Sequence, residues 1–161
     1  IKTIGQVINY YFCFNVNIKA MISPVSECLY CQKLPILEDL MLKITDLEVS
    51  ELFLFREQSH LGRCNVVYKD HGLELHDLTE EQRNLFMKDV CKAANAIAKA
   101  FNPDKINYGA FSDKLSHLHI HLVPKYEGGY NFGGVIEMNP QKKFLSGKEN
   151  SEIIKKIIAE L

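Results

Sequence analysis

The sequence lacks tryptophan altogether and has almost no net charge. Lysine and arginine number 19 and aspartate and glutamate number 20, which leaves a formal charge of −1. A global attraction to nucleic acid or to acidic membranes is therefore excluded. With 47% hydrophobic and 24% charged residues, the composition also excludes a disordered chain. A chain of 161 residues is expected to fold around one core and to recognise a partner through a local site.

A long hydrophobic run is missing as well. Residues 3–18 are uncharged, but four glutamine or asparagine residues interrupt them, and they fall short of the roughly 20 apolar residues that span a bilayer. The stretch has neither the dense apolar centre nor the cleavage site of a signal peptide. Since the first methionine is Met21, we treat residues 1–20 as an N-terminal extension without an assigned role. Residues 21–161 are expected to form a single domain, and no membrane partner is expected.

The five cysteines are an odd number and are scattered along the chain, which is not typical of a disulfide framework. They predict a reducing compartment and a cytoplasmic protein. Cys28 and Cys31 have the spacing with which two thiolates bind one zinc ion. A free or redox-active cysteine pair is the alternative. We expect Cys64 and Cys91 to be buried thiols, and His60 and His76 to be exposed loop residues.

Alternating and β-branched runs predict five strands, at 41–45, 51–55, 64–68, 105–111 and 116–124. A long helix is predicted to begin at Thr79, where Thr79 to Gln82 form a capping box, and to end at Asn102. Its apolar stripe has helical spacing and consists of Phe86, Val90, Ala94, Ile97 and Phe101. A last helix is predicted to begin near Ser151 and to bury Ile154, Ile157, Ile158 and Leu161. This order predicts an α+β fold with an antiparallel five-stranded sheet, one long central helix and a C-terminal helix.

The fifth predicted strand carries three alternating histidines, His117, His119 and His121. Successive strand side chains point to opposite faces, so the imidazoles line one face at intervals of about 7 Å. The apolar residues between them face the helices. Plain core packing is disfavoured, because each buried imidazole would need a hydrogen-bond partner. A catalytic metal held by the row is a further alternative.

The run from His117 to Val123 resembles the signature of the histidine triad superfamily of nucleotide hydrolases and transferases, His-φ-His-φ-His-φ-φ, in which φ is apolar. The resemblance covers roughly residues 28–126. It includes three further segments in the family's order: Lys69-Asp70-His71, His76-Asp77-Leu78 and Asn107-Tyr108-Gly109.

This resemblance implies an enzyme in which His119 attacks the α-phosphorus of a nucleotide and forms a nucleotidyl-histidine intermediate. It implies that His121 contacts the phosphoryl oxygens and that Asn107 binds phosphate. The expected substrate is a purine nucleotide, either an adenosine phosphoramidate or a dinucleoside polyphosphate, and the covalent step requires no magnesium. The resemblance further implies a homodimer.

The resemblance also implies how the zinc site is completed. In related branches, two histidines join the cysteine pair, and they correspond here to His71 and His117. Together with Cys28 and Cys31 they are expected to bind one structural zinc ion per chain.

The chain departs from the family pattern at several positions. In an ungapped match, Phe55 stands where the family has an aspartate that binds the ribose. Glu57 is a candidate to replace that aspartate if the match is shifted slightly. Arg63 replaces a family histidine, either as a cation for phosphate or as a solvated surface residue. Ser112 and Lys114 are candidates for a missing phosphate donor. These departures motivate an alternative function, a zinc-stabilised purine-nucleotide-binding module with little catalysis.

Overall fold

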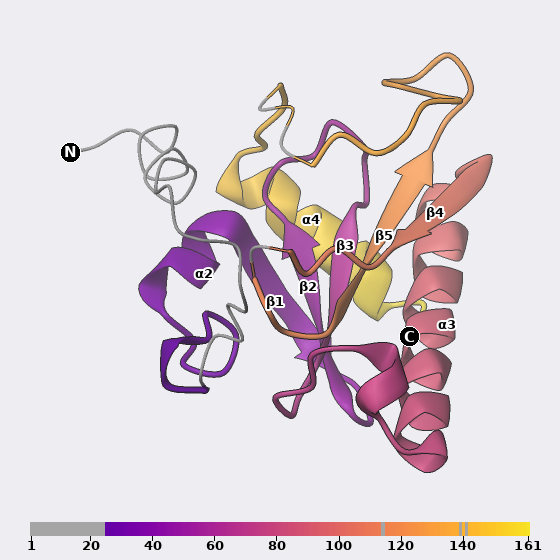
Figure 1. Ribbon diagram of the computed structural model, residues 1–161. Coiled ribbons are helices and arrows are strands. Elements are labelled where there is room, and N and C mark those ends of the chain that lie inside the picture. Colours follow the sequence, from indigo (N-terminus) through magenta and orange to yellow (C-terminus); the bar gives the residue numbers. More distant parts are fainter. Residues whose placement is uncertain (1–24, 114, 139, 141) are drawn as a thin grey trace.

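The computed structural model describes residues 25–113, 115–138, 140 and 142–161, and Figure 1 shows their arrangement. The N-terminal extension at 1–20 and Lys114 lie outside the described residues. No helix in the described part of the chain is long and apolar enough to cross a bilayer.

An antiparallel sheet of five strands organises the fold, as the sequence predicts (Figure 1). The strands lie in the order β1-β2-β3-β5-β4. Their bounds are β1 Met41–Asp46, β2 Ser50–Phe55, β3 Cys64–Tyr68, β4 Lys105–Gly109 and β5 His119–Lys125. The α+β class is confirmed. The largest boundary differences from the prediction are that β4 ends at Gly109 and β5 begins at His119, while the end of β1, the start of β2 and the end of β5 each differ by one residue.

The main core lies between one face of the sheet and two helices. Helix α3 (Glu80–Phe101) begins at the predicted capping box, in which the Thr79 hydroxyl accepts from the backbone of Gln82. It ends at Asn102, whose φ of 47° is left-handed. The predicted stripe is confirmed: Phe86, Val90, Ala94 and Ile97 are buried and Phe101 packs at the margin.

Asp89 fixes α3 to the turn between β1 and β2. Its carboxylate is 2% exposed and accepts from the backbone N–H of Glu48 and Val49 and from the hydroxyl of Ser50, at 2.7 to 3.2 Å. These partners lie in that turn and at the first residue of β2. Helix α3 is thereby held at a defined place on the sheet.

Helix α4 (Gly147–Ile158) begins four residues earlier than predicted. Ser146 and Glu149 form a second capping box, which explains the earlier start. The predicted buried set is partly wrong: Ile153 and Ile157 are buried, whereas Ile158 is 49% exposed. Ile154 and Leu161 are partly buried at the edge of the core.

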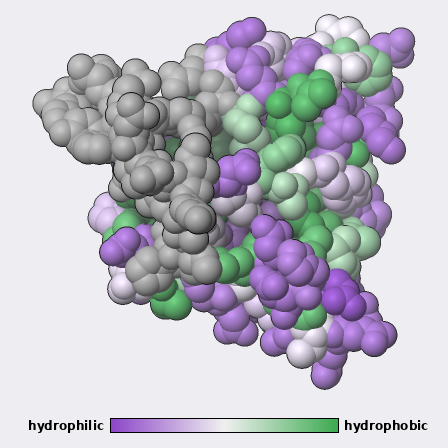
Figure 2. Space-filling view, in the orientation of Figure 1, coloured by the Kyte–Doolittle hydropathy of each residue, from purple (hydrophilic) through white to green (hydrophobic). Residues whose placement is uncertain are grey.

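A second, smaller core covers the opposite face of the sheet. It joins the short helix α2 (Pro35–Leu40) and the preceding Cys28–Cys31 segment to β2 and β3. Two short 3₁₀ turns, η1 (Val25–Glu27) and η2 (Leu75–Asp77), complete the described elements. The segment from Cys28 to Leu40 therefore packs on the face of the sheet that carries the histidines. In the orientation of Figure 1, the described surface is mostly hydrophilic with smaller hydrophobic patches (Figure 2).

Candidate functional site

The three imidazoles lie on the α2 side of the sheet, as the alternation predicts. His117, His119 and His121 are each at most 2% exposed, while Leu118, Ile120 and Leu122 lie in the main core. His117 precedes β5, but backbone bonds of Leu118 to Tyr68 and to Gly72 continue the strand geometry through it. A strict pleat thus separates the polar face from the core.

His119 is oriented by the backbone of its own segment. Its Nδ1 lies 2.7 Å from the carbonyl oxygen of His117. A carbonyl oxygen only accepts, so Nδ1 carries the proton and Nε2 keeps its lone pair. Burial lowers the pKa of His119, which favours the neutral imidazole. A neutral ring with a free Nε2 lone pair is a competent nucleophile.

His121 lies among rings, and neither of its ring nitrogens has a hydrogen-bond partner in the described part of the chain. Its ring centroid is 5.0 Å from that of His119, 5.9 Å from Phe55 and 6.3 Å from Phe111. Burial, followed by the neighbouring His119 and Arg63, holds its pKa far below the usual range. His121 is therefore neutral at physiological pH.

Four side chains from three parts of the chain meet beside His119. One donor atom from each of Cys28, Cys31, His71 and His117 lies within 4.8 Å of the other three. Sγ of Cys28 is 3.3 Å from Nδ1 of His117, and Sγ of Cys31 is 3.3 Å from Nδ1 of His71. The edges of a tetrahedral zinc site with bonds of about 2.0–2.3 Å measure about 3.3–3.8 Å. The donor set and its spacing fit a tetrahedral metal ion.

The same cluster has the supporting bond that metal-binding histidines usually make. Nε2 of His117 donates to the carbonyl of Tyr68 at 2.7 Å, so its Nδ1 presents a lone pair to the two thiols. Cys28 and Cys31 are not joined by a disulfide. This cluster can bind a metal ion.

Arg63 is buried, so its alternative prediction as a solvated surface residue is wrong. Its side chain is 0% exposed, and its guanidinium lies 4.0 Å from the centroid of the Phe55 ring. Nη1 donates to the carbonyl of Met138 at 2.8 Å and lies 3.9 Å from Oε2 of Glu57. Burial lowers the pKa of Arg63 to about 10, which still leaves it charged at neutral pH.

Asn65 is a residue that the sequence reasoning missed. It pairs directly with His121 in the antiparallel register and is 0% exposed, and neither of its amide atoms has a hydrogen-bond partner within residues 25–113, 115–138, 140 and 142–161. The signal was present in the sequence, since Asn65 is the one amide within the otherwise apolar run that forms β3.

The structure places two further predicted phosphate-binding residues around the histidines. Asn107 on β4 pairs with Val123, one pleat beyond the pairing of Gly109 with His121, and is partly exposed. The hydroxyl of Ser112 donates to the carbonyl of His117 at 3.3 Å, the same oxygen that His119 contacts. Ser112 thus touches the backbone that orients His119.

Several smaller expectations are corrected. His60 is 1% exposed rather than a surface residue, because its ring packs 5.3 Å from that of Tyr130. Cys91 is exposed rather than buried, since it lies on the outer side of α3, whereas Cys64 is buried as predicted. His76 is exposed, as expected. Glu57 accepts from the backbone N–H of Ser59 and Lys143, so its carboxylate holds loops together.

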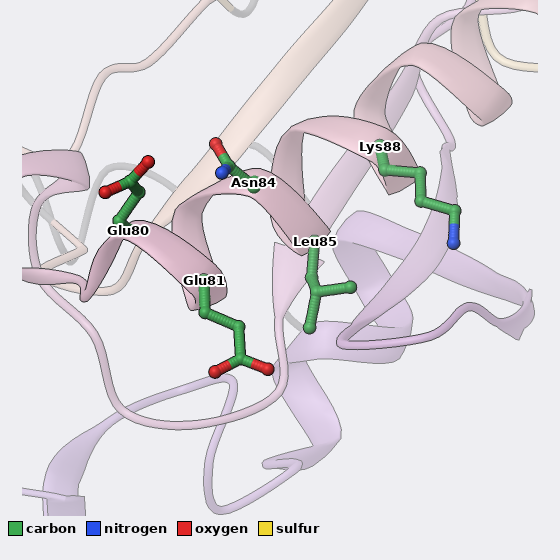
Figure 3. A pocket seen from close by; sticks show the side chains of 5 residues that line it. All are labelled: Glu80, Glu81, Asn84, Leu85 and Lys88. Atoms are coloured by element: carbon green, nitrogen blue, oxygen red, sulfur yellow. The ribbon is translucent and has the colours of Figure 1, made fainter.

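A surface hollow of about 520 Å³ lies apart from the histidines, along the first turns of α3. Figure 3 shows that its lining side chains all come from this one helix: Glu80, Glu81, Asn84, Leu85 and Lys88. Because one helix supplies all of these side chains, the hollow does not bring together residues from different parts of the fold. The histidine face remains the candidate functional site.

Known proteins resemble this chain in sequence and in fold. The family model "HIT domain" matches residues 43–128. Adenosine 5′-monophosphoramidase HNT1 of Saccharomyces cerevisiae is 30% identical over 105 residues, which are 62% of this chain and 63% of the yeast protein. The adenosine 5′-monophosphoramidase hnt1 of Schizosaccharomyces pombe is 24% identical over 121 residues, 70% of this chain and 88% of that protein. The chain thus spans less than two thirds of the Saccharomyces protein.

Solved structures share the fold. A histidine triad protein from Bradyrhizobium japonicum superposes with a TM-score of 0.72 at 19% identity, covering 79% of this chain and 95% of that one. A zinc-bound histidine triad family protein from Mycobacterium smegmatis gives a TM-score of 0.57 at 17% identity, covering 85% and 94%. At these identities the likeness concerns the fold alone.

Proposed function

This chain belongs to the histidine triad family, whose HIT domain covers more than half of it, and we propose on that premise that it is a nucleotide hydrolase with His119 as nucleophile. The observation that carries the proposal is the bond from Nδ1 of His119 to the His117 carbonyl at 2.7 Å. This bond leaves the Nε2 lone pair free to attack phosphorus. Relatives named adenosine 5′-monophosphoramidase support the reaction class.

The reaction has two displacements. Nε2 of His119 forms a bond to the α-phosphorus of a purine nucleotide, and the bond from that phosphorus to the leaving group breaks. The leaving group departs with the electron pair of the broken bond. Water then forms a bond to the phosphorus of the nucleotidyl-histidine and gives up a proton to solvent. The bond from Nε2 to phosphorus breaks, its electron pair returns to Nε2, and the nucleoside monophosphate is released with His119 restored.

The remaining residues bind or position. His121 donates a hydrogen bond to the transferring phosphoryl group, and Asn107 contacts the phosphate from β4. Arg63 supplies the positive charge of the site, and Ser112 and Lys114 are proposed donors to the phosphate. Ser112 also contacts the carbonyl that orients His119.

The metal proposed for the cysteine–histidine cluster is one structural zinc ion per chain. Cys28, Cys31, His71 and His117 would hold it, and it would supply a fixed link between the segment around Cys28 and Cys31 and the backbone ahead of β5. The proposed covalent step needs no magnesium. A cytoplasmic location and a homodimer complete the proposal, the dimer by analogy with the family.

A second function has one observation in its favour. Phe55 is buried where the family carries a ribose-binding carboxylate, and Glu57 is engaged by Ser59 and Lys143. A zinc-stabilised module that binds purine nucleotides with little turnover is the alternative.

The test is replacement of the nucleophile. His119→Ala is expected to abolish hydrolysis of adenosine 5′-phosphoramidate and of diadenosine polyphosphates, and to abolish the phosphorus adduct seen by intact-protein mass spectrometry. The matched control is His76→Ala, because His76 is exposed and remote from the site. Unchanged turnover in His119→Ala contradicts the mechanism, and tight nucleotide binding without turnover in the unmutated protein favours the binding module.

A further inference from the structure

Three buried side chains on the histidine face, Arg63, Asn65 and His121, have between them six polar atoms without a hydrogen-bond partner among the described residues. They are Nε and Nη2 of Arg63, both amide atoms of Asn65 and both ring nitrogens of His121. The three residues are 0%, 0% and 2% exposed. Buried polar atoms are nearly always paired in native proteins, so this concentration of unpaired atoms favours a site for a polar ligand.

The three residues form a row that leads away from His119. In the register of β3 and β5, Val67 lies opposite His119 and Asn65 lies opposite His121. Arg63 lies two residues before Asn65 in the chain, on the same side of the pleat, which corresponds to a distance of about 7 Å. Its guanidinium lies over Phe55, whose ring also contacts His121. A ligand bound at His119 therefore meets His121 and Asn65 first and Arg63 last.

The free atoms of the row favour an anion with several oxygens. Nη1 of Arg63 is engaged by Met138 and lies 3.9 Å from Glu57, while Nε and Nη2 remain as two parallel donors. This pair of donors matches two phosphate oxygens. The amide of Asn65 adds a donor between the arginine and His121. Burial raises the pKa of the Tyr30 hydroxyl and the neighbouring Asn65 amide lowers it, so these two side chains lie close together.

We propose that Arg63 and Asn65, which follow His121 in this row, bind a phosphate on the leaving group, so that the enzyme prefers nucleotides whose α-phosphorus is joined to a second phosphate by an anhydride oxygen. The preferred class is thus dinucleoside polyphosphates and related anhydrides over phosphoramidates. This inference rests on the nucleophilic role of His119 in the proposed function.

The chemistry of the leaving group agrees with this choice. The bond from Nε2 of His119 to the α-phosphorus forms while the bond from that phosphorus to the bridging oxygen breaks. The bridging oxygen keeps the electron pair and departs as part of a phosphate anion, which needs no proton. An amine would need one, and His121, whose pKa is lowered by burial, His119 and Arg63, is a poor acid.

The experiment compares kcat/KM for diadenosine tetraphosphate and for adenosine 5′-phosphoramidate in the full zinc-loaded chain. The unmutated protein is expected to prefer the tetraphosphate at least tenfold. Arg63→Met keeps an unbranched apolar side chain but removes the guanidinium over Phe55, and it is expected to lower that preference at least tenfold. Asn65→Leu is expected to lower it at least threefold. The matched control is Arg83→Met on α3, which should leave the preference unchanged. An equal loss with both substrates, or an unaltered preference, overturns the proposal.

A binding measurement separates this inference from the proposed function. Calorimetry on His119→Ala is expected to show ADP binding at least tenfold tighter than AMP, and the addition of Arg63→Met should remove that difference. If the unmutated chain turns over no nucleotide, the nucleophile assignment fails, and the ADP-to-AMP ratio still decides the phosphate site. Equal affinities for ADP and AMP overturn the site. Should Arg63→Met not fold, the same ratios in Asn65→Leu and Arg63→Lys decide it.

Discussion

The carbonyl oxygen of His117 accepts a hydrogen bond from Nδ1 of His119, while the imidazole of His117 lies 3.3 Å from the thiol of Cys28. One residue therefore contributes its side chain to the metal-binding cluster and its backbone to the orientation of the proposed nucleophile. Ser112 contacts the same carbonyl. Disturbing the cluster is expected to disturb the histidine face as well.

Removal of one thiol tests this relationship. Cys31→Ser is expected to lower bound zinc from one equivalent per chain to less than one fifth, because a structural site needs all four ligands. Hydrolysis and the thermal midpoint should fall together, since the proposed metal would link the segment around Cys28 and Cys31 to the strand of His119. Metal analysis, a melting curve and turnover measure the three quantities. The matched control is Cys91→Ser, because Cys91 is exposed on α3. Full zinc occupancy in Cys31→Ser contradicts the assigned site.

Metal affinity should depend on pH in a defined direction. Burial, followed by the neighbouring Cys28 and Asp70, raises the pKa of Cys31 to about 11, so this thiol is protonated in the metal-free protein at neutral pH. Binding must release that proton, and the apparent zinc affinity therefore falls as pH is lowered. We expect about a tenfold loss per pH unit for each thiol proton released. A competition titration between pH 8 and pH 6 with a chelator of known proton linkage measures it. A pH-independent affinity would show that the thiols are not ligands.

The Asp89 contact predicts a stability effect without a direct catalytic one. Asp89→Ala removes the acceptor for two backbone N–H groups and the Ser50 hydroxyl. The expected loss in the free energy of unfolding is about 1–3 kcal/mol, because these buried donors lose their partner. Urea unfolding measures it, with Asp39→Ala as the control, since Asp39 is exposed on α2. A change within about 0.5 kcal/mol would mean that the turn finds other partners.

The start of α4 is also testable. Ser146→Ala removes the side chain that accepts from Glu149, which is expected to cost about 0.5–2 kcal/mol. Ser151→Ala is the comparison, because Ser151 lies within the helix and bonds only to the carbonyl of Gly147. Denaturant titration measures the free energy of unfolding of both variants, and the loss should be larger for Ser146→Ala than for Ser151→Ala. A larger loss for Ser151→Ala would place the helix start where the sequence pattern alone predicted it.

Patterns that depend on local geometry were predictable. The alternation of His117 to Val123 places three imidazoles on one face whatever the rest of the chain does, because the pleat has a period of two. The box at Thr79 and the stripe from Phe86 likewise depend only on helix geometry. The predicted start of the last helix was wrong, because the apolar pattern placed it near Ser151, whereas the capping box begins at Ser146.

Features that require distant segments to meet were not determined locally. The sequence alone identified Cys28 and Cys31 as a candidate pair, and the resemblance named His71 and His117, but the fold brings their four donor atoms within 4.8 Å. The fold also buried Arg63 and His60 and exposed Cys91, since burial depends on which element packs over a residue rather than on the residue itself. Asn65 became part of the site only through its register with His121, a pairing set by β3 and β5 together.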